Sequence, residues 1–78
     1  MYKIVFSDAA HFEYNTIGEI INAMDNLSDY DSLLFEVNWW DGSSQYRKGQ
    51  MAGELDGFLS EFNRDGIVSV VVFVIPKD

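Results

Sequence analysis

The sequence contains no cysteine and a single histidine. Without cysteine the chain can form neither a disulfide bond nor a thiolate zinc site, so an apolar core has to stabilise its 78 residues. A chain of this length makes one domain, residues 1–78, and buries only roughly 60–65% of its unfolded surface. Hydrophobic residues make up 47% of the chain and aromatic residues 15%, which favours a packed core over disorder.

Basic residues are also scarce, with 5 Lys and Arg against 13 Asp and Glu and a net charge of −8. Residues 1–46 hold eight of the acids and only Lys3 as a base, a net charge of −7. Binding to phosphates requires basic groups, so this composition disfavours direct contact with nucleic acid or with an anionic membrane. It favours either a basic protein partner or acidity that serves only solubility.

Long apolar runs are absent. The longest, VVVFVI at 70–75, is far too short to cross a bilayer. The first residues, MYKIVFSDAAHFEY, lack the charged n-region and apolar h-region of a signal peptide. We therefore expect a cytoplasmic protein without a membrane partner.

Hydrophobic periodicity predicts four strands and two helices, with a loop at 7–15. The spacing of Thr16 and Glu19 fits a capping box at the start of the first helix. Asp41-Gly42 next to a β-rich run is a hairpin signal that predicts a short returning strand. The expected strands are 2–6, 33–40, 44–48 and 67–75, and the expected helices are 16–27 and 50–63.

This order, β-α-β-β-α-β, predicts an α+β domain of the ferredoxin-like, split-βαβ type. We expect an antiparallel sheet with both helices on one face, because each helix has a single apolar stripe. An alternative omits the short arm at 44–48 and gives a parallel three-stranded sheet covered on both sides. The last strand, apolar on both faces, favours this alternative.

Alternation along residues 33–40 assigns the two adjacent tryptophans to opposite faces of the sheet. Trp39 continues the apolar series and is predicted to lie in the core. Trp40 is predicted to lie on or near the open face beside the hairpin turn. We expect that open face to be an apolar patch, and such patches usually mark an interface. Its predicted members are Val5, Leu34, Trp40, Val70, Val72 and Val74.

No catalytic or metal-binding motif stands out in the chain. Asp8, His11 and Glu13 supply too few ligands for zinc, and Ser7 with Asp8 and His11 lacks the elbow and oxyanion motifs of a hydrolase. The scattered glycines form neither GxGxxG nor a P-loop. We therefore expect a protein that is not an enzyme and that uses no cofactor.

Acidic and aromatic side chains are the candidates for binding a protein partner. Carboxylates spaced like phosphates could occupy a basic groove that normally holds nucleic acid. Trp and Tyr are frequent hot spots at interfaces. Arg47 and Lys48 are interpreted as edge-strand protection. The predicted partner-binding residues are Asp25, Asp29, Asp31, Glu36, Trp40, Tyr46, Glu54 and Glu61.

The segment LLFEVNWWDGSSQYRKGQMAGELDGFLSEF, residues 33–62, reads as a hairpin followed by an amphipathic helix with an aromatic last turn. In size, charge and architecture it resembles small acidic phage proteins of the anti-CRISPR type. Those proteins block CRISPR effector complexes, some by imitating DNA. Residues 33–75 also resemble acidic inhibitors of the barstar type. Neither resemblance assigns a role to an individual residue.

Two functions follow as hypotheses. The first is a non-enzymatic inhibitor or decoy, encoded by a phage and acting in the cytoplasm of a bacterial host, that binds a nucleic-acid-processing protein by blocking or imitating nucleic acid. The second is a structural or assembly module that forms a homodimer through the open sheet face, with acidity serving solubility only.

Overall fold

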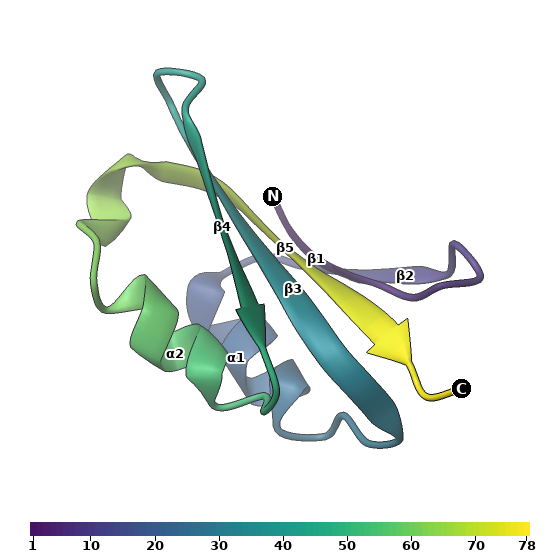
Figure 1. Cartoon of the computed structure of the whole chain (residues 1–78). Coiled ribbons are helices and arrows are strands. Elements are labelled where there is room, and N and C mark those ends of the chain that lie inside the picture. Colours follow the sequence, from purple (N-terminus) through teal and green to yellow (C-terminus); the bar gives the residue numbers. More distant parts are fainter.

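Five strands and two α-helices alternate along the chain in the computed structural model, which describes all residues 1–78 (Figure 1). The α+β class is confirmed, and the predicted arm at 44–48 is a strand. The elements are β1 (Tyr2–Val5), β2 (His11–Tyr14), α1 (Ile17–Met24), β3 (Tyr30–Trp39), β4 (Ser44–Gly49), α2 (Glu54–Leu59), a 3₁₀ turn (Arg64–Gly66) and β5 (Ile67–Pro76).

The strands form one mixed sheet in the order β2-β1-β5-β3-β4. The β1–β5 pair is parallel, whereas β1–β2, β3–β5 and β3–β4 are antiparallel. The prediction of a purely antiparallel, ferredoxin-like sheet is therefore wrong. The parallel three-stranded alternative is wrong as well, because β4 pairs with β3 over six registers from Leu33–Gly49 to Asn38–Ser44.

The strand β2 lies where a loop was predicted. Residues 6–10 form a tight turn in which the Phe6 carbonyl accepts from the Ala9 N–H (3.0 Å) and the Phe6 N–H donates to the Ala10 carbonyl (2.8 Å). Ala9 has φ of 70° there, a conformation that alanine seldom adopts. The Asp8 carboxylate also accepts from the Ala10 N–H (3.0 Å). Ser7 and Asp8 indicated a loop, but without the usual glycine or asparagine the sequence did not indicate a tight hairpin.

The first helix confirms its predicted cap. The Thr16 hydroxyl accepts from the Glu19 N–H (3.1 Å), and the Glu19 carboxylate accepts from the Thr16 N–H (3.3 Å). The second helix is shorter than the predicted 50–63 and covers only Glu54–Leu59. Gly57 lies inside the helix, where glycine is unfavourable, and Gly53 is an N-cap without a side-chain capping bond.

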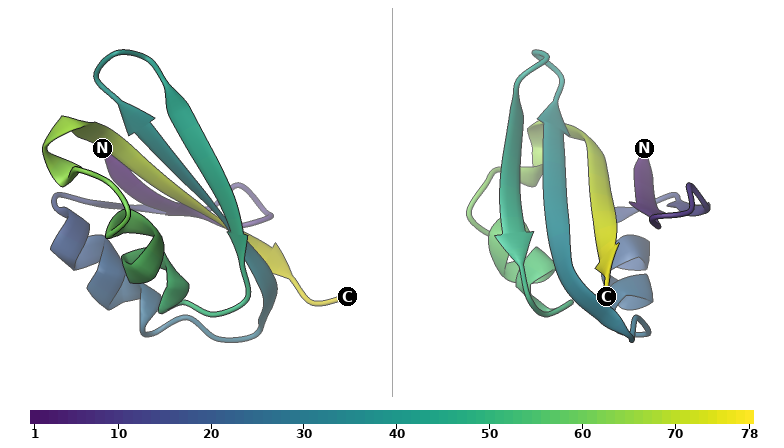
Figure 2. Two further views of the ribbon diagram at one scale, coloured as in Figure 1. Left: turned by 60° about the vertical axis from the view of Figure 1, so that its left-hand side comes forward. Right: turned by 45° about the vertical axis from the view of Figure 1, so that its right-hand side comes forward.

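Both helices cover the same face of the sheet, as predicted, and the core lies between them and the strands (Figure 2). In the sheet, Phe35 and Val37 of β3 lie opposite Val72 and Val70 of β5, and all four are fully buried. The other buried core residues are Ile4, Ile20, Met24, Leu33, Leu55, Phe58, Leu59 and Ile67.

This register corrects the predicted open face. Val70 and Val72 point into the core and Val74 packs against it, while Val71 and Phe73 point to the face without helices. Both faces of β5 are apolar, so alternation alone could not say which face is covered. The predicted open-face positions of Val5 and Leu34 agree with the registers, in which both lie opposite Phe73.

Candidate functional site

The predicted partner-binding residues do not form one cluster. Asp31 and Trp40 lie near opposite ends of β3, nine positions apart, which is about 30 Å of extended strand. The whole molecule measures 36 × 22 × 21 Å. The eight residues fall into four groups: the stretch from the end of α1 to the start of β3, the open sheet face, the β3–β4 hairpin tip, and the surroundings of α2.

Three of the predicted acids lie between the end of α1 and the start of β3, and we call Asp25, Asp29 and Asp31 the acidic end. All three are exposed, and none of their carboxylates makes a hydrogen bond or ion pair within the chain. Asp25 is the C-cap of α1, where the helix dipole disfavours a negative charge. Asp29 has φ of 58°, which aspartate tolerates better than most residues. Helix stability therefore does not explain the charge of the acidic end.

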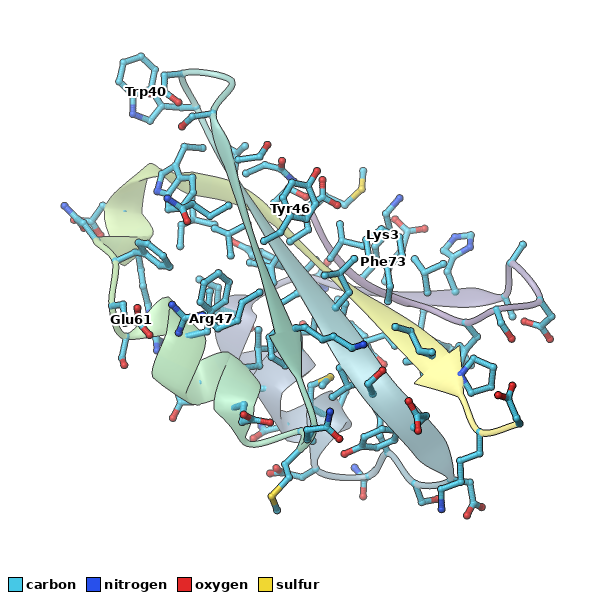
Figure 3. The ribbon with its side chains drawn as sticks, viewed as in Figure 1. Lys3, Trp40, Tyr46, Arg47, Glu61 and Phe73 are labelled. Atoms are coloured by element: carbon cyan, nitrogen blue, oxygen red, sulfur yellow. The ribbon has the colours of Figure 1, made fainter.

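Glu54 and Glu61, by contrast, serve the fold. One Glu54 oxygen accepts from the N–H groups of Gln50 and Met51, both at 2.6 Å, and these bonds lower the pKa of the carboxyl. Glu61 forms a bidentate ion pair with Arg47, which lowers the pKa of Glu61 and raises that of Arg47 (Figure 3). Both carboxylates are thus engaged inside the chain.

Arg47 also has a packing role that the sequence did not reveal. Its guanidinium carbon lies 4.6 Å from the centre of the Phe58 ring, within the range of a cation–π contact. Arg47 therefore fastens β4 to α2 from the helix side of the sheet. The interpretation of Arg47 as edge protection overlooked this contact, because nothing local in the sequence links Arg47 to Glu61 fourteen residues later.

The side chains of Trp39 and Trp40 have different surroundings at the end of β3, although the two residues are adjacent in the sequence. Trp39 is half-buried and packs edge-on against Phe62, with ring centres 5.1 Å apart. Trp40 is 79% exposed at the hairpin tip (Figure 3). A β-carbon added at Gly66 would lie 3.2 Å from Trp39 and 3.3 Å from Trp40, so both indoles approach this glycine closely.

The hairpin tip is held by Asp41. One of its oxygens, Oδ1, accepts from the Ser43 N–H (2.9 Å) and from the Ser43 hydroxyl (2.6 Å), and these bonds lower the pKa of the carboxyl. Gly42 supplies the positive φ of 86° that the turn requires. The Asp-Gly hairpin signal in the sequence is therefore confirmed in its physical detail.

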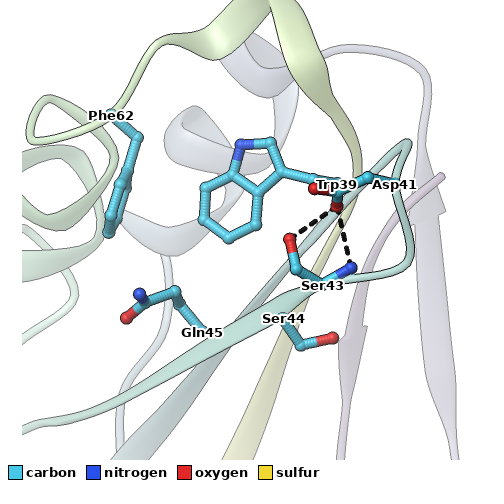
Figure 4. A pocket seen from close by; sticks show the side chains of 6 residues that line it. All are labelled: Trp39, Asp41, Ser43, Ser44, Gln45 and Phe62. Carbon is cyan, nitrogen blue, oxygen red and sulfur yellow. Dashed lines mark hydrogen bonds between the residues drawn. The ribbon is translucent and has the colours of Figure 1, made fainter.

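Beside the tip lies a shallow, open hollow of about 340 Å³ (Figure 4). The ring of Trp39 and the ring of Phe62 form its apolar wall, and Asp41 contributes a carboxylate. Because both Ser43 bonds use Oδ1, the second oxygen of Asp41 stays open to other donors. Aromatic rings beside a carboxylate suit a lysine or arginine side chain. The remaining lining residues are Ser43, Ser44 and Gln45.

Glu36 and Tyr46 lie next to each other on the open sheet face. The Tyr46 hydroxyl donates to a Glu36 oxygen at 3.0 Å, and the neighbouring carboxylate raises the pKa of Tyr46. Around them the face has a narrow apolar centre rather than the broad patch that was predicted. Val71 is only 6% exposed, because its neighbours on this face already cover it.

Groups suited to metal binding or acid–base catalysis do not converge. His11 Nε2 lies 3.6 Å from a Glu13 oxygen on exposed β2, and no group of three or more His, Asp or Glu side chains is placed to hold a metal ion. Neither α1 nor α2 is long and apolar enough to cross a membrane. Comparison of the chain with protein-family models, with curated proteins and with solved structures finds no match.

Proposed function

We propose that the protein is a non-enzymatic acidic inhibitor or decoy that binds the basic surface of a nucleic-acid-processing protein. A CRISPR effector complex in the cytoplasm of a bacterial host is the first target to test, in line with the resemblance to anti-CRISPR proteins. The observation that carries the proposal is the acidic end, in which Asp25, Asp29 and Asp31 have no internal partner.

The basic side chains do not offset this acidity. Arg47 is paired with Glu61, and Arg64 donates to Asp56 at 3.0 Å. Exposed and uncompensated charge is therefore predominantly negative. A surface that binds nucleic acid is positive, so it would attract this protein over a long range and at a rate that falls with added salt.

The hairpin tip supplies the second half of the proposed contact. Trp40 is an exposed aromatic anchor, and the hollow beside it fits a lysine or arginine of the partner against Trp39 and the open oxygen of Asp41. A partner that engages the acidic end and the tip together needs a basic surface about 30 Å long, the length of β3. This is close to one turn of B-form DNA, roughly 34–36 Å.

The test measures DNA cleavage by purified CRISPR effector complexes at increasing concentrations of the protein and at several salt concentrations. The variant D25N/D29N/D31N removes three charges and keeps the size of each side chain. We expect it to weaken inhibition at least about tenfold, with a smaller dependence on salt.

The matched control is D8N/E13Q/D65N, which removes three exposed carboxylates elsewhere and gives the same net charge. It should inhibit like the unmodified protein. Equal weakening by both variants would show that only total charge matters. Lack of inhibition of every effector tested, with no binding to any of them, would reject this target class.

A further inference from the structure

The open sheet face differs in charge from the rest of the molecule. Among its paired positions, Lys3 and Lys48 are positive and Glu13 and Glu36 are negative. With a neutral His11 these charges cancel, so this face has no net charge. The whole chain carries −8. The net negative charge makes two copies of the chain repel each other, and a face without net charge adds least to that repulsion.

The three central strands arrange the side chains of this face in rows. One row runs Lys3–Val71–Glu36 across β1, β5 and β3, with Val71 in the middle. The neighbouring row runs Val5–Phe73–Leu34. Adjacent strands are about 4.8 Å apart, so Lys3 and Glu36 stand at equal distances on either side of β5. Figure 3 shows Lys3, Phe73 and Tyr46 gathered over the middle of the sheet.

We propose that this face binds a second copy of the same chain, with a two-fold axis running parallel to β5 between the two sheets. Such an axis exchanges the two sides of β5, so each β1 lies over the partner's β3. Lys3 of each copy then faces Glu36 of the other, and Val5 faces Leu34. Val71 and Phe73 lie near the axis, and because Val71 is already covered within its own chain, Phe73 is the side chain that meets its counterpart. The row is therefore self-complementary, as an isologous interface requires.

The outer strands are compatible with this arrangement. The same rotation brings Glu13 on β2 toward Tyr46 on β4, and His11 toward Lys48, so no carboxylate faces another carboxylate. Sheets that pack face to face lie about 10 Å apart and cross at about −30°, which leaves the three central strands in the closest contact.

The area of the open face determines how strong a dimer we expect. Five strands of about 4.8 Å spacing and roughly 20 Å of length give about 500 Å² per copy, or about 1,000 Å² in total. This lies at the lower limit of stable interfaces. We therefore expect a weak dimer, with a dissociation constant in the micromolar range or above.

The decisive experiment uses charge reversal at the paired positions. In Lys3→Glu the partner's Glu36 meets a second carboxylate, and in Glu36→Lys the partner's Lys3 meets a second ammonium. Each variant alone should be a monomer in sedimentation velocity from micromolar to millimolar concentration. An equal mixture of the two should form a heterodimer, because both contacts are then of opposite charge. The double variant K3E/E36K should dimerise like the unmodified chain.

Controls separate this outcome from altered folding and from total charge. Arg64→Glu and Asp65→Lys make the same changes of charge in the exposed 3₁₀ turn, outside the five strands, and should leave the dimer unchanged. Circular dichroism checks that each variant is folded. Phe73→Asp provides a second variant at the axis and should abolish the dimer.

A strict monomer at millimolar concentration would overturn the proposal. So would a dimer that persists in both single variants, or single variants that are monomeric and stay monomeric when mixed. The inference does not depend on the proposed function, since it is measured without any target and uses none of the acidic-end residues.

Discussion

The two faces of the sheet are built from the same strands but place equally apolar residues in different surroundings. On β5, Val70 and Val72 are fully buried beneath the helices. Phe73, the residue after Val72, points to the other side of the sheet and stays partly exposed. Close packing of apolar side chains determines the covered face, whereas pairs of charged and polar side chains line the open face. The difference indicates that one face stabilises the fold and the other is available for association.

Truncation of one phenylalanine on each face should separate these roles most clearly. Phe35 is fully buried and stacks with Phe58 at a ring-centre distance of 6.2 Å. Phe35→Ala should lower the free energy of unfolding by about 3–5 kcal/mol, because it leaves a cavity. Phe73→Ala should lower it by only about 1 kcal/mol. Urea denaturation at low protein concentration measures both, and equal losses would contradict the comparison.

Gly49 tests how tightly the covered face is packed at its edge. A β-carbon there would lie 2.7 Å from the Phe35 ring, so Gly49→Ala should lower the free energy of unfolding by about 1–3 kcal/mol through overpacking. Gly57 is the matched control, since a β-carbon there meets nothing within 4 Å. Gly57→Ala should stabilise α2 by up to about 1 kcal/mol. Thermal and urea denaturation measure the free energy of unfolding of both variants. A stabilising Gly49→Ala or a destabilising Gly57→Ala would contradict the prediction.

Acid titration tests the carboxylates that fasten the helix side. Folding lowers the pKa of Glu54 and Glu61 below their ordinary value of 4.5. Their stabilising contribution is therefore complete above that value and is lost as the pH falls through the lowered, folded-state values. Between pH 6 and pH 2 the melting temperature of E54Q/E61Q should change less than that of the unmodified chain.

The variant D29N/D31N is the control for this titration, because those carboxylates lie outside the helices and make no bonds in the folded chain. It should keep the acid dependence of the unmodified protein. The same flattening in both variants would mean that net charge, rather than the Glu54 and Glu61 contacts, sets the sensitivity to acid.

The smallest expected effect lies on the open face. Glu36 raises the pKa of Tyr46 above its ordinary value of 10.0, so this contribution to stability is present below that value and is lost as the pH rises through the raised one. In Glu36→Gln the pKa of Tyr46 should return toward 10.0. NMR titration of ¹³C-labelled tyrosine follows Tyr46 individually. An unchanged pKa would mean that the Tyr46–Glu36 hydrogen bond does not form in solution.

Local signals in the sequence predicted the parts of the fold that depend on neighbouring residues. The capping box of Thr16 and Glu19, the Asp-Gly hairpin and the alternation that buries Phe35 and Val37 are all confirmed. Each involves residues a few positions apart whose chemistry allows one local geometry. The extent of α2 was overestimated because its flanking turns continue the helical spacing of apolar residues.

Long-range pairing explains what the sequence could not predict. The partners of β5 are β1 and β3, and a strand that is apolar on both faces fits several neighbours equally well. The β1–β2 turn through Ala9 had Ser7 and Asp8 as turn residues but no glycine or asparagine at the position of positive φ. At the candidate site, the acidic end could be predicted from composition, but the internal use of Glu54 and Glu61 depends on contacts that form only in the folded chain.

The central position of β5 has a consequence for synthesis in the cell. This strand joins β1 to β3, so the sheet cannot close until residues 67–76 have left the ribosome. Until then β1–β2 and β3–β4 are separate hairpins with unpaired edges and an uncovered apolar side, and isolated hairpins are marginally stable at best. The sheet should therefore form in a single step once β5 has emerged. Before that step, the negative charge of the nascent chain should limit its association with other chains.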